Sequence, residues 1–146
     1  MTPPRVWRLD HLVLTVASID ETVRFYTGVL GMSEVVFGQG RRALAFGDQK
    51  LNLHQVGHEF EPKAARPTAG SADLCLVVDA DVETIGRWLA ARGVDVEGPV
   101  ARTGALGPVT SFYIRDPDDN LIELATYAGS GREIPDVDET SDHRRV

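Results

Sequence analysis

The sequence predicts an α+β protein of two tandem βαβββ modules that form a curved mixed sheet around a central cavity. Three observations predict it: residues 8–16 alternate apolar and polar side chains, a helical apolar stripe follows them, and both patterns return 62 residues later. The chain has 146 residues, enough for one compact domain or for two small modules that share a core.

The first module begins with a strand over residues 8–16, after an irregular lead-in over residues 1–7. Ser18 and Glu21 have the spacing of a capping box, and Gly31 suits the position that ends a helix. Between them the apolar residues recur at helical intervals. They are Ile19, Val23, Phe25, Tyr26, Val29 and Leu30. We therefore expect an amphipathic helix directly after the first strand.

Three short strands are expected to complete this module, separated by glycine-bearing turns. They are residues 33–38, 41–46 and 50–55. Because successive strand residues point to opposite faces, Asn52 and His54 share one face of the last strand. The first module is thus expected to span residues 8–55.

The second module repeats the first at the offset of 62 residues. This offset maps residues 21–23 onto 83–85, Tyr26 onto Trp88, Gly31 onto Gly93 and His11 onto Asp73. Agreement of helix stripe, charges and terminal glycine at one offset indicates a duplication. Three further strands are expected at residues 94–97, 108–115 and 120–126. The second module is therefore expected to span residues 72–127.

Three other segments do not follow the repeat. Residues 56–71 hold two prolines, two glycines and mixed charges, which is typical of a linker or pocket loop. Residues 116–120 (DPDDN) predict a turn in which Asp and Asn side chains bind the backbone. Residues 128–146 are polar and lack apolar rhythm, which predicts a mobile tail.

The composition excludes several classes of protein. A net charge of −7 argues against nucleic acid as a partner, which requires a basic surface. No apolar run is long enough to span a bilayer, and the first residues lack the pattern of a secretory signal. Cys75 is the only cysteine, so no intrachain disulfide can form and we expect a cytoplasmic protein.

Four potential metal ligands occupy equivalent strand positions in the two modules. His11 and Asp73 lie in the first strands, while His54 and Glu123 lie in the fourth strands. All four are expected on the sheet faces that the helices leave open. A charged group inside a strand costs several kcal/mol unless it is paired or bound to metal.

Imidazole together with carboxylate suits one divalent transition metal ion, either Zn, Ni, Co, Mn or Fe. Other interpretations exist for each residue taken alone. His11 or His54 would be a hydrogen-bonded or surface histidine, Glu123 the partner of an arginine, and Asp73 a cap or a hydrogen-bond partner of a ligating histidine. The symmetric set favours the metal site.

These motifs resemble those of the vicinal oxygen chelate superfamily, which groups glyoxalase I, bleomycin resistance proteins and dioxygenases. The resemblance rests on four stretches that cover the chain from about residue 8 to residue 127. They are residues 9–16 (LDHLVLTV), 25–32 (FYTGVLGM), 51–54 (LNLH) and 112–124 (FYIRDPDDNLIEL). Residues 60–65 and 102–108 are most similar to loops of the small glyoxalase-domain-containing proteins.

The resemblance implies that the metal ligands are His11, His54, Asp73 and Glu123, on a sheet that curls around the ion. It also implies a homodimer, because in many members two chains exchange modules. Compared with glyoxalase I itself, which is a lactoylglutathione lyase, the ligand types are exchanged. His54 stands where that enzyme has Glu, and Asp73 where it has His.

The first hypothesis is a metal-dependent lyase or isomerase that stabilises an enediolate or oxyanion of a small oxygen-bearing substrate, with Glu123 as the base. The loops 56–71 and 102–108 would close over that substrate. Possible contacts to it are Asn52, Lys63, Arg66 and Arg102, although the three cations would equally suit a solvated surface.

Two alternatives stay open. The chain would be a drug- or metabolite-binding resistance protein without turnover if no metal is bound. It would be an Fe(II)-dependent dioxygenase if His11, His54 and Glu123 form a triad of two histidines and one carboxylate.

Overall fold

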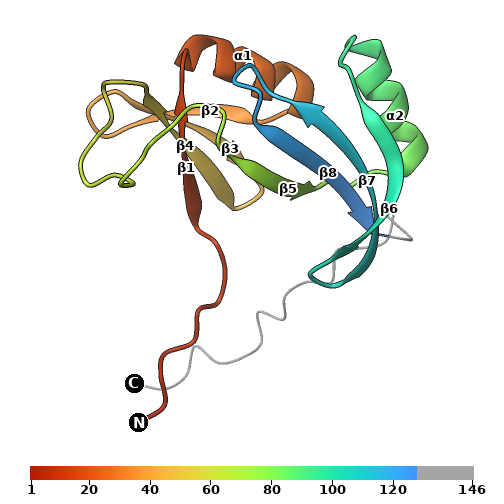
Figure 1. Cartoon of the computed structure of the whole chain (residues 1–146), viewed down its shortest axis with the longest axis horizontal. Coiled ribbons are helices and arrows are strands. Elements are labelled where there is room, and N and C mark those ends of the chain that lie inside the picture. The colour runs from red at the N-terminus through yellow and green to blue at the C-terminus, as the bar shows by residue number, and fades with distance from the viewer. Residues whose placement is uncertain (128–146) are drawn as a thin grey trace. The chain divides into compact units, whose positions relative to one another are not determined.

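The computed structural model describes residues 1–127, so the predicted tail over residues 128–146 lies outside the described residues. Figure 1 shows two βαβββ modules, as the sequence predicts. The chain divides into two compact units, each of which is made of segments that are not contiguous in the sequence. Residues 115–121 belong to the first unit together with residues 1–73, while the second unit holds residues 74–114 and the chain from residue 122.

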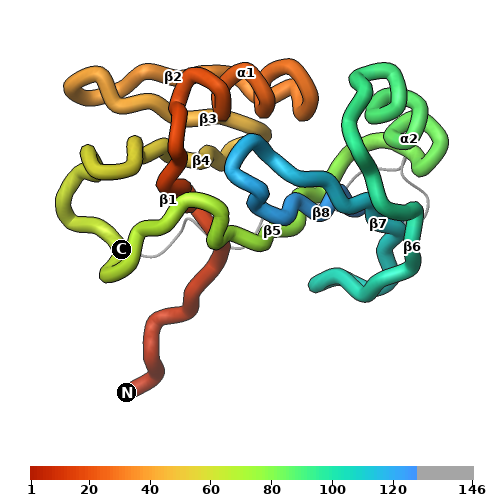
Figure 2. The backbone as a smooth tube through the Cα atoms, turned by 45° about the horizontal axis from the view of Figure 1, so that its top comes forward, coloured from red at the N-terminus to blue at the C-terminus, as the bar shows by residue number. Residues whose placement is uncertain are grey.

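The first unit contains a mixed four-stranded sheet in the order β1-β4-β3-β2. Its elements are β1 (His11–Val16), α1 (Ile19–Leu30), β2 (Ser33–Phe37), β3 (Arg41–Phe46) and β4 (Gln49–Gln55). The edge strand β1 runs parallel to β4, whereas the other neighbours are antiparallel. Figure 2 shows the chain leaving β4 in a long loop before β5 begins.

Helix α1 begins and ends where the sequence predicts. The Ser18 side chain accepts a hydrogen bond of 3.2 Å from the backbone N–H of Glu21, and Gly31 adopts a φ of 65° in the left-handed region. Val23 and Tyr26 are buried on the helix. The core also contains alternate residues of β1 and β4, namely Leu14, Val16, Leu51 and Leu53. Full burial of one such side chain stabilises the fold by about 1.5–3 kcal/mol.

The second unit contains most of a four-stranded sheet in the order β5-β8-β7-β6, whose strands each extend at most one residue into the first unit. Its elements are β5 (Asp73–Val77), α2 (Val82–Ala91), β6 (Glu97–Gly104), β7 (Gly107–Arg115) and β8 (Leu121–Tyr127). Asp81 caps α2 by accepting a hydrogen bond of 2.7 Å from the backbone N–H of Thr84. Neither of the two helices in residues 1–127 is long and apolar enough to cross a membrane.

The structure differs from the prediction between α2 and β7. Residues 94–96 are not a strand, because the backbone N–H of Val94 bonds the carbonyl of Leu89 and completes the end of the helix. The segment 102–108 is not an open loop either. Gly104 pairs with Gly107, so this segment forms the tight hairpin between β6 and β7.

The repeat also predicts that Trp88 is equivalent to Tyr26, which is wrong for packing. Tyr26 is fully buried, whereas 44 % of Trp88 is exposed and the Arg92 guanidinium lies 4.1 Å from its ring. Helix α2 starts one residue later than the offset predicts, after Asp81, and buries Leu89 instead. The exact offset therefore identifies the second helix and matches buried Val23 with buried Ile85, but it fails at Trp88.

Candidate functional site

The parallel pairing of β1 with β4 determines which side chains share the open face of the first sheet. Thr15 pairs with His54, Val13 with Asn52, and His11 with Lys50. His11 and His54 therefore point to the same face, but they lie four residues apart along the strands, about 13 Å at the usual rise. Asn52 is closer to His11 in this register than His54 is.

His54 is a buried histidine whose distal nitrogen has no partner. Only 3 % of the residue is exposed, and its Nε2 forms no hydrogen bond in the described part of the chain. The Phe60 ring packs edge-on against the imidazole, with the ring centres 5.6 Å apart. Burial, together with the nearby charge of Arg41, lowers the pKa of His54. The imidazole is therefore neutral near pH 7, and its Nε2 is available to accept or to donate a hydrogen bond.

Asn52 lies one position along the same face of β4 and is 5 % exposed. Its Oδ1 has no hydrogen-bond partner among the described residues. Ala43, the residue paired with it on β3, is fully buried and has no polar side-chain atom to offer. An unpaired buried acceptor costs about 1–3 kcal/mol, so two neighbouring polar groups without partners indicate a site prepared for a ligand.

His11 has a different environment from His54. It begins β1, its side chain is 45 % exposed, and its Nδ1 lies 2.7 Å from the Asp10 carboxylate. This hydrogen bond lowers the pKa of Asp10. Because Nδ1 is engaged, Nε2 is the nitrogen of His11 that remains for another partner.

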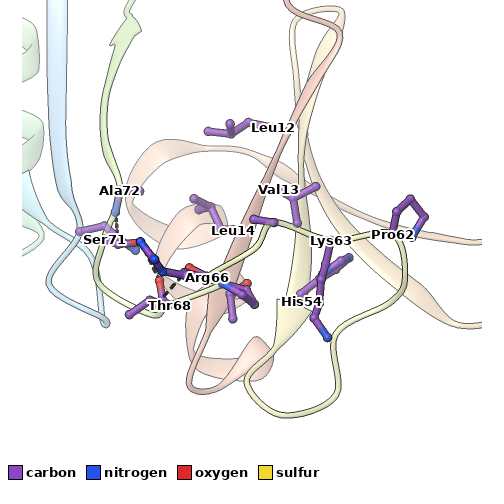
Figure 3. Close-up of a pocket in the computed structure, with 14 residues that line it drawn as sticks. Leu12, Val13, Leu14, His54, Pro62, Lys63, Arg66, Thr68, Ser71 and Ala72 are labelled. Atoms are coloured by element: carbon purple, nitrogen blue, oxygen red, sulfur yellow. Dashed lines mark hydrogen bonds between the residues drawn. The ribbon is translucent and has the colours of Figure 1, made fainter.

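A pocket of about 460 Å³ lies beside β1 in the first unit, and His54 forms part of its wall. Its lining comes from β1, β4, the loop over residues 62–72 and one buried asparagine. The residues are Leu12, Val13, Leu14, Thr15, His54, Pro62, Lys63, Ala64, Arg66, Pro67, Thr68, Ser71, Ala72 and Asn120. Figure 3 shows His54 and Lys63 toward one end, Thr68, Ser71 and Ala72 toward the other, and Arg66 between them.

The end of the pocket loop is held by the turn over residues 116–120. The Asn120 side chain accepts a hydrogen bond of 2.8 Å from the backbone N–H of Ala72, and Leu121 donates to the Ala72 carbonyl. Gly70 lies so close to this turn that a Cβ added there would be 2.5 Å from the Asp118 carbonyl oxygen. The turn therefore positions one wall of the pocket.

The turn itself is built on a buried carboxylate. Asp116 Oδ1 accepts hydrogen bonds of 2.9 Å from the backbone N–H groups of Asp118 and Asn120. Its Oδ2 accepts bonds of 2.8 Å from the Tyr26 hydroxyl and the Asn120 amide. The sequence prediction that Asp and Asn side chains bind the backbone here is confirmed. It missed the contact to Tyr26, whose only signal was its place in the apolar stripe.

The cations expected at the substrate have different partners. Lys63 forms a 2.7 Å ion pair with Glu61, while the Arg66 guanidinium has no polar partner within residues 1–127. Arg102 does not line the pocket of the first unit. In β6 it donates a 3.0 Å hydrogen bond to the Tyr113 hydroxyl and another to the carbonyl of Ala101.

The two expected carboxylate ligands belong to the second sheet. Asp73 is exposed at the start of β5, and Glu123 is half-buried in β8. Within residues 1–127, no three His, Cys, Asp or Glu side chains come together in a way that could hold a metal ion. The first unit thus presents His54 and Asn52 as a prepared pair, and the four-ligand set stays a prediction.

The fold agrees with the comparison to protein families. Residues 8–124 match the model of the glyoxalase/bleomycin resistance protein/dioxygenase superfamily. The chain belongs to this superfamily. Members of the superfamily bind small molecules, and they include metal-dependent enzymes as well as binding proteins. The resemblance in the four sequence motifs is therefore confirmed.

Three relatives are similar to this chain over 80 % or more of its length. The virulence protein STM3117 of Salmonella typhimurium is 57 % identical over 121 residues, which cover 82 % of this chain and 84 % of that protein. Its crystal structure aligns with a TM-score of 0.84 over 85 % of this chain and 99 % of that one, at 54 % identity.

A fungal relative and a bacterial dioxygenase are also similar. The glyoxalase domain-containing protein RDO1 of Mycosarcoma maydis is 58 % identical over 120 residues, covering 82 % of this chain and 68 % of that protein. Biphenyl-2,3-diol 1,2-dioxygenase 3 of Rhodococcus globerulus is 30 % identical over 124 residues, covering 80 % of this chain and 62 % of the enzyme.

Proposed function

We propose that the protein is a glyoxalase-like metal-dependent enzyme of the lyase or isomerase type that acts on a small oxygen-bearing substrate. The observation that carries this proposal is His54, whose Nε2 is buried without a partner at the wall of the pocket. A superfamily fold supports the class of function, and the unpaired imidazole supports a ligand at this position.

The donor chemistry fits a divalent transition metal ion. A metal requires neutral imidazole, and the lowered pKa of His54 provides it. The proposed ligands are His54 and His11 from the first sheet and Asp73 and Glu123 from the second. Zn, Ni, Co, Mn or Fe suits such a mixture. When bound, the ion would polarise substrate oxygens as a Lewis acid.

The proposal gives further roles to Glu123, Asn52 and the apolar wall of the pocket. Glu123 is the proposed base, because a carboxylate can take the proton removed from a substrate carbon. The Asn52 Oδ1, which has no partner, would accept a hydrogen bond from a substrate hydroxyl. The apolar wall of Leu12, Val13 and Leu14 would exclude water from the reacting atoms.

The proposal includes a homodimer in the cytoplasm. The proposed ligands come from two separate sheets, and two chains that exchange modules would bring His11 and His54 of one chain to Asp73 and Glu123 of the other. Sedimentation equilibrium tests this, since a strictly monomeric protein would contradict the exchange. The single cysteine, Cys75, supports a reducing compartment.

Metal content measured by inductively coupled plasma mass spectrometry tests the central proposal. We expect about one equivalent in the purified or reconstituted protein, and a loss of most of it in His54→Ala and Glu123→Ala. His58→Ala is the matched control, because His58 is an exposed histidine that does not line the pocket. Less than about a tenth of an equivalent after reconstitution would contradict the metal-dependent function.

A binding protein without turnover is the second candidate. It is favoured by the lack of a cluster of three possible metal ligands within the described 127 residues. In that case the metal measurement gives no binding, while a small ligand still saturates the pocket. Oxygen uptake with Fe(II) and a catechol-type diol would instead support the dioxygenase alternative, to which the 30 % identical relative points.

A further inference from the structure

The charges around the pocket of the first unit are one-sided. No Asp or Glu belongs to its lining, whereas Lys63 and Arg66 both do. Glu61 already neutralises Lys63 through their ion pair. The Arg66 guanidinium has no hydrogen bond or ion pair with any residue that the structure describes, so its charge is the one left for a ligand.

The polar groups of the loop itself are already used. Thr68 donates a 3.1 Å hydrogen bond to the Arg66 carbonyl, and Ser71 donates one of 2.8 Å to the Thr68 carbonyl. These bonds hold the backbone of the loop and leave the arginine side chain out of its internal network. The loop therefore does not supply an anionic partner for Arg66 itself, and an anion at this side chain would be a bound ligand.

Much of the remaining wall is apolar, and it contains two deeply buried polar residues, His54 and Asn120. Leu12, Leu14 and Pro67 present hydrocarbon to a space of about 460 Å³, which is the size of a pocket for a small molecule. The Asn120 side chain accepts a hydrogen bond from the Ala72 N–H, whereas the His54 Nε2 has no partner among the described residues. Figure 3 shows Arg66 and His54 at separate points along the pocket.

We propose that the pocket recognises a small carboxylate with a short apolar body, with the carboxylate at Arg66 and the oxygen-bearing end toward His54. An arginine fork matches a carboxylate with two parallel hydrogen bonds, and a neutral buried imidazole does not compete for the same charge. The inference rests on the proposed function in taking this molecule as the substrate. It names the substrate class as anionic.

Phenylacetate is a simple probe of this class, and phenylacetamide is its neutral match. In an NMR titration of the full chain, we expect phenylacetate to shift the amide signals of residues 12–15 and 62–72 with millimolar saturation. Phenylacetamide should bind about tenfold more weakly, because it cannot form the charge-assisted pair. Arg66→Gln should weaken phenylacetate by the same factor and leave phenylacetamide unchanged.

Arg87→Gln is the matched control, since Arg87 is an exposed arginine of α2 that forms only a 3.7 Å ion pair with Glu83. It should bind phenylacetate as the unaltered protein does. Absence of saturable shifts at the pocket up to about 20 mM phenylacetate would overturn the inference. Equal affinity for acid and amide, or an Arg66→Gln protein with unchanged affinity, would overturn it as well.

The titration is run on chelator-treated and on metal-loaded protein, which separates this inference from the proposed function. Arg66-dependent binding in both states supports the inference whatever the metal content. Binding that needs the metal and ignores Arg66→Gln overturns the inference while the metal-dependent function stands. If the protein takes up no metal but binds phenylacetate through Arg66, the metal-dependent function is contradicted and the inference of an anion pocket is supported.

Discussion

Replacement of Asp116 by Asn should destabilise the protein strongly, because both carboxylate oxygens are fully used. Each oxygen accepts two hydrogen bonds, so an amide group turned either way points an NH₂ at two donors. Hydrogen bonds to a charged acceptor contribute about 1.5–3 kcal/mol each. With two of them lost at a site that is 4 % exposed, Asp116→Asn should lower the free energy of unfolding by about 3–5 kcal/mol.

A double-mutant cycle with Tyr26→Phe identifies the origin of this loss. Tyr26→Phe alone removes one donor to the carboxylate and should cost about 1–2 kcal/mol. In that background the amide introduced by Asp116→Asn meets one donor instead of two where Oδ2 was, so the double variant should cost at least about 1 kcal/mol less than the sum of the single variants. Urea unfolding followed by circular dichroism measures all four proteins. Strict additivity, or an Asp116→Asn cost below about 0.5 kcal/mol, would refute the reasoning.

Other predictions concern the pocket loop and His54. Gly70→Ala should lower the free energy of unfolding in urea by about 2–4 kcal/mol, because φ is +79° and the new Cβ meets the Asp118 carbonyl oxygen. Gly57→Ala is the control, since Gly57 has the same φ but open space around it, and it should cost about 1 kcal/mol. Equal costs for the two variants would contradict the steric argument. In an NMR titration of metal-free protein, the His54 imidazole should titrate below the ordinary histidine value of about 6.5, because burial and the nearby Arg41 charge lower its pKa. Since the unfolded state then binds more protons, the free energy of unfolding should fall as pH decreases from 6.5 to the folded pKa, and His54→Gln should flatten that slope.

The order and type of most elements could be predicted from the sequence because local physics decides them. Alternation identified the strands around His11 and Leu53, and the Ser18 cap and Gly31 bounded the first helix as observed. The second helix followed from the repeat. Prediction failed between residues 94 and 108. The hydrogen bonds that finish α2 replace the start of the predicted strand at residues 94–96, and β6 with its two-residue hairpin occupies residues that were expected to form a loop.

The sequence predicts which side chains of the site share a face of the sheet, but it does not predict their distances from one another. Alternation puts His11, Asn52 and His54 on one side of the sheet, but only the pairing of β1 with β4 shows that His54 lies opposite Thr15. Register depends on long-range packing, which sequence spacing does not contain. The burial of Asp116 was hidden for the same reason, since an Asp in a turn is ordinarily exposed and its partner, Tyr26, is 90 residues away.

The Asp116 turn also bears on how this duplicated protein is made and how it has diverged. Tyr26 in the first helix finds its acceptor only when residue 116 is available, so a ribosome must extend the chain through most of the second copy before the first unit is complete. A fragment that stops near residue 73 would expose a helix and a pocket loop without their anchor. The first copy therefore depends on a turn that the second copy supplies, and a cut at the repeat boundary would remove that turn from the unit to which it belongs.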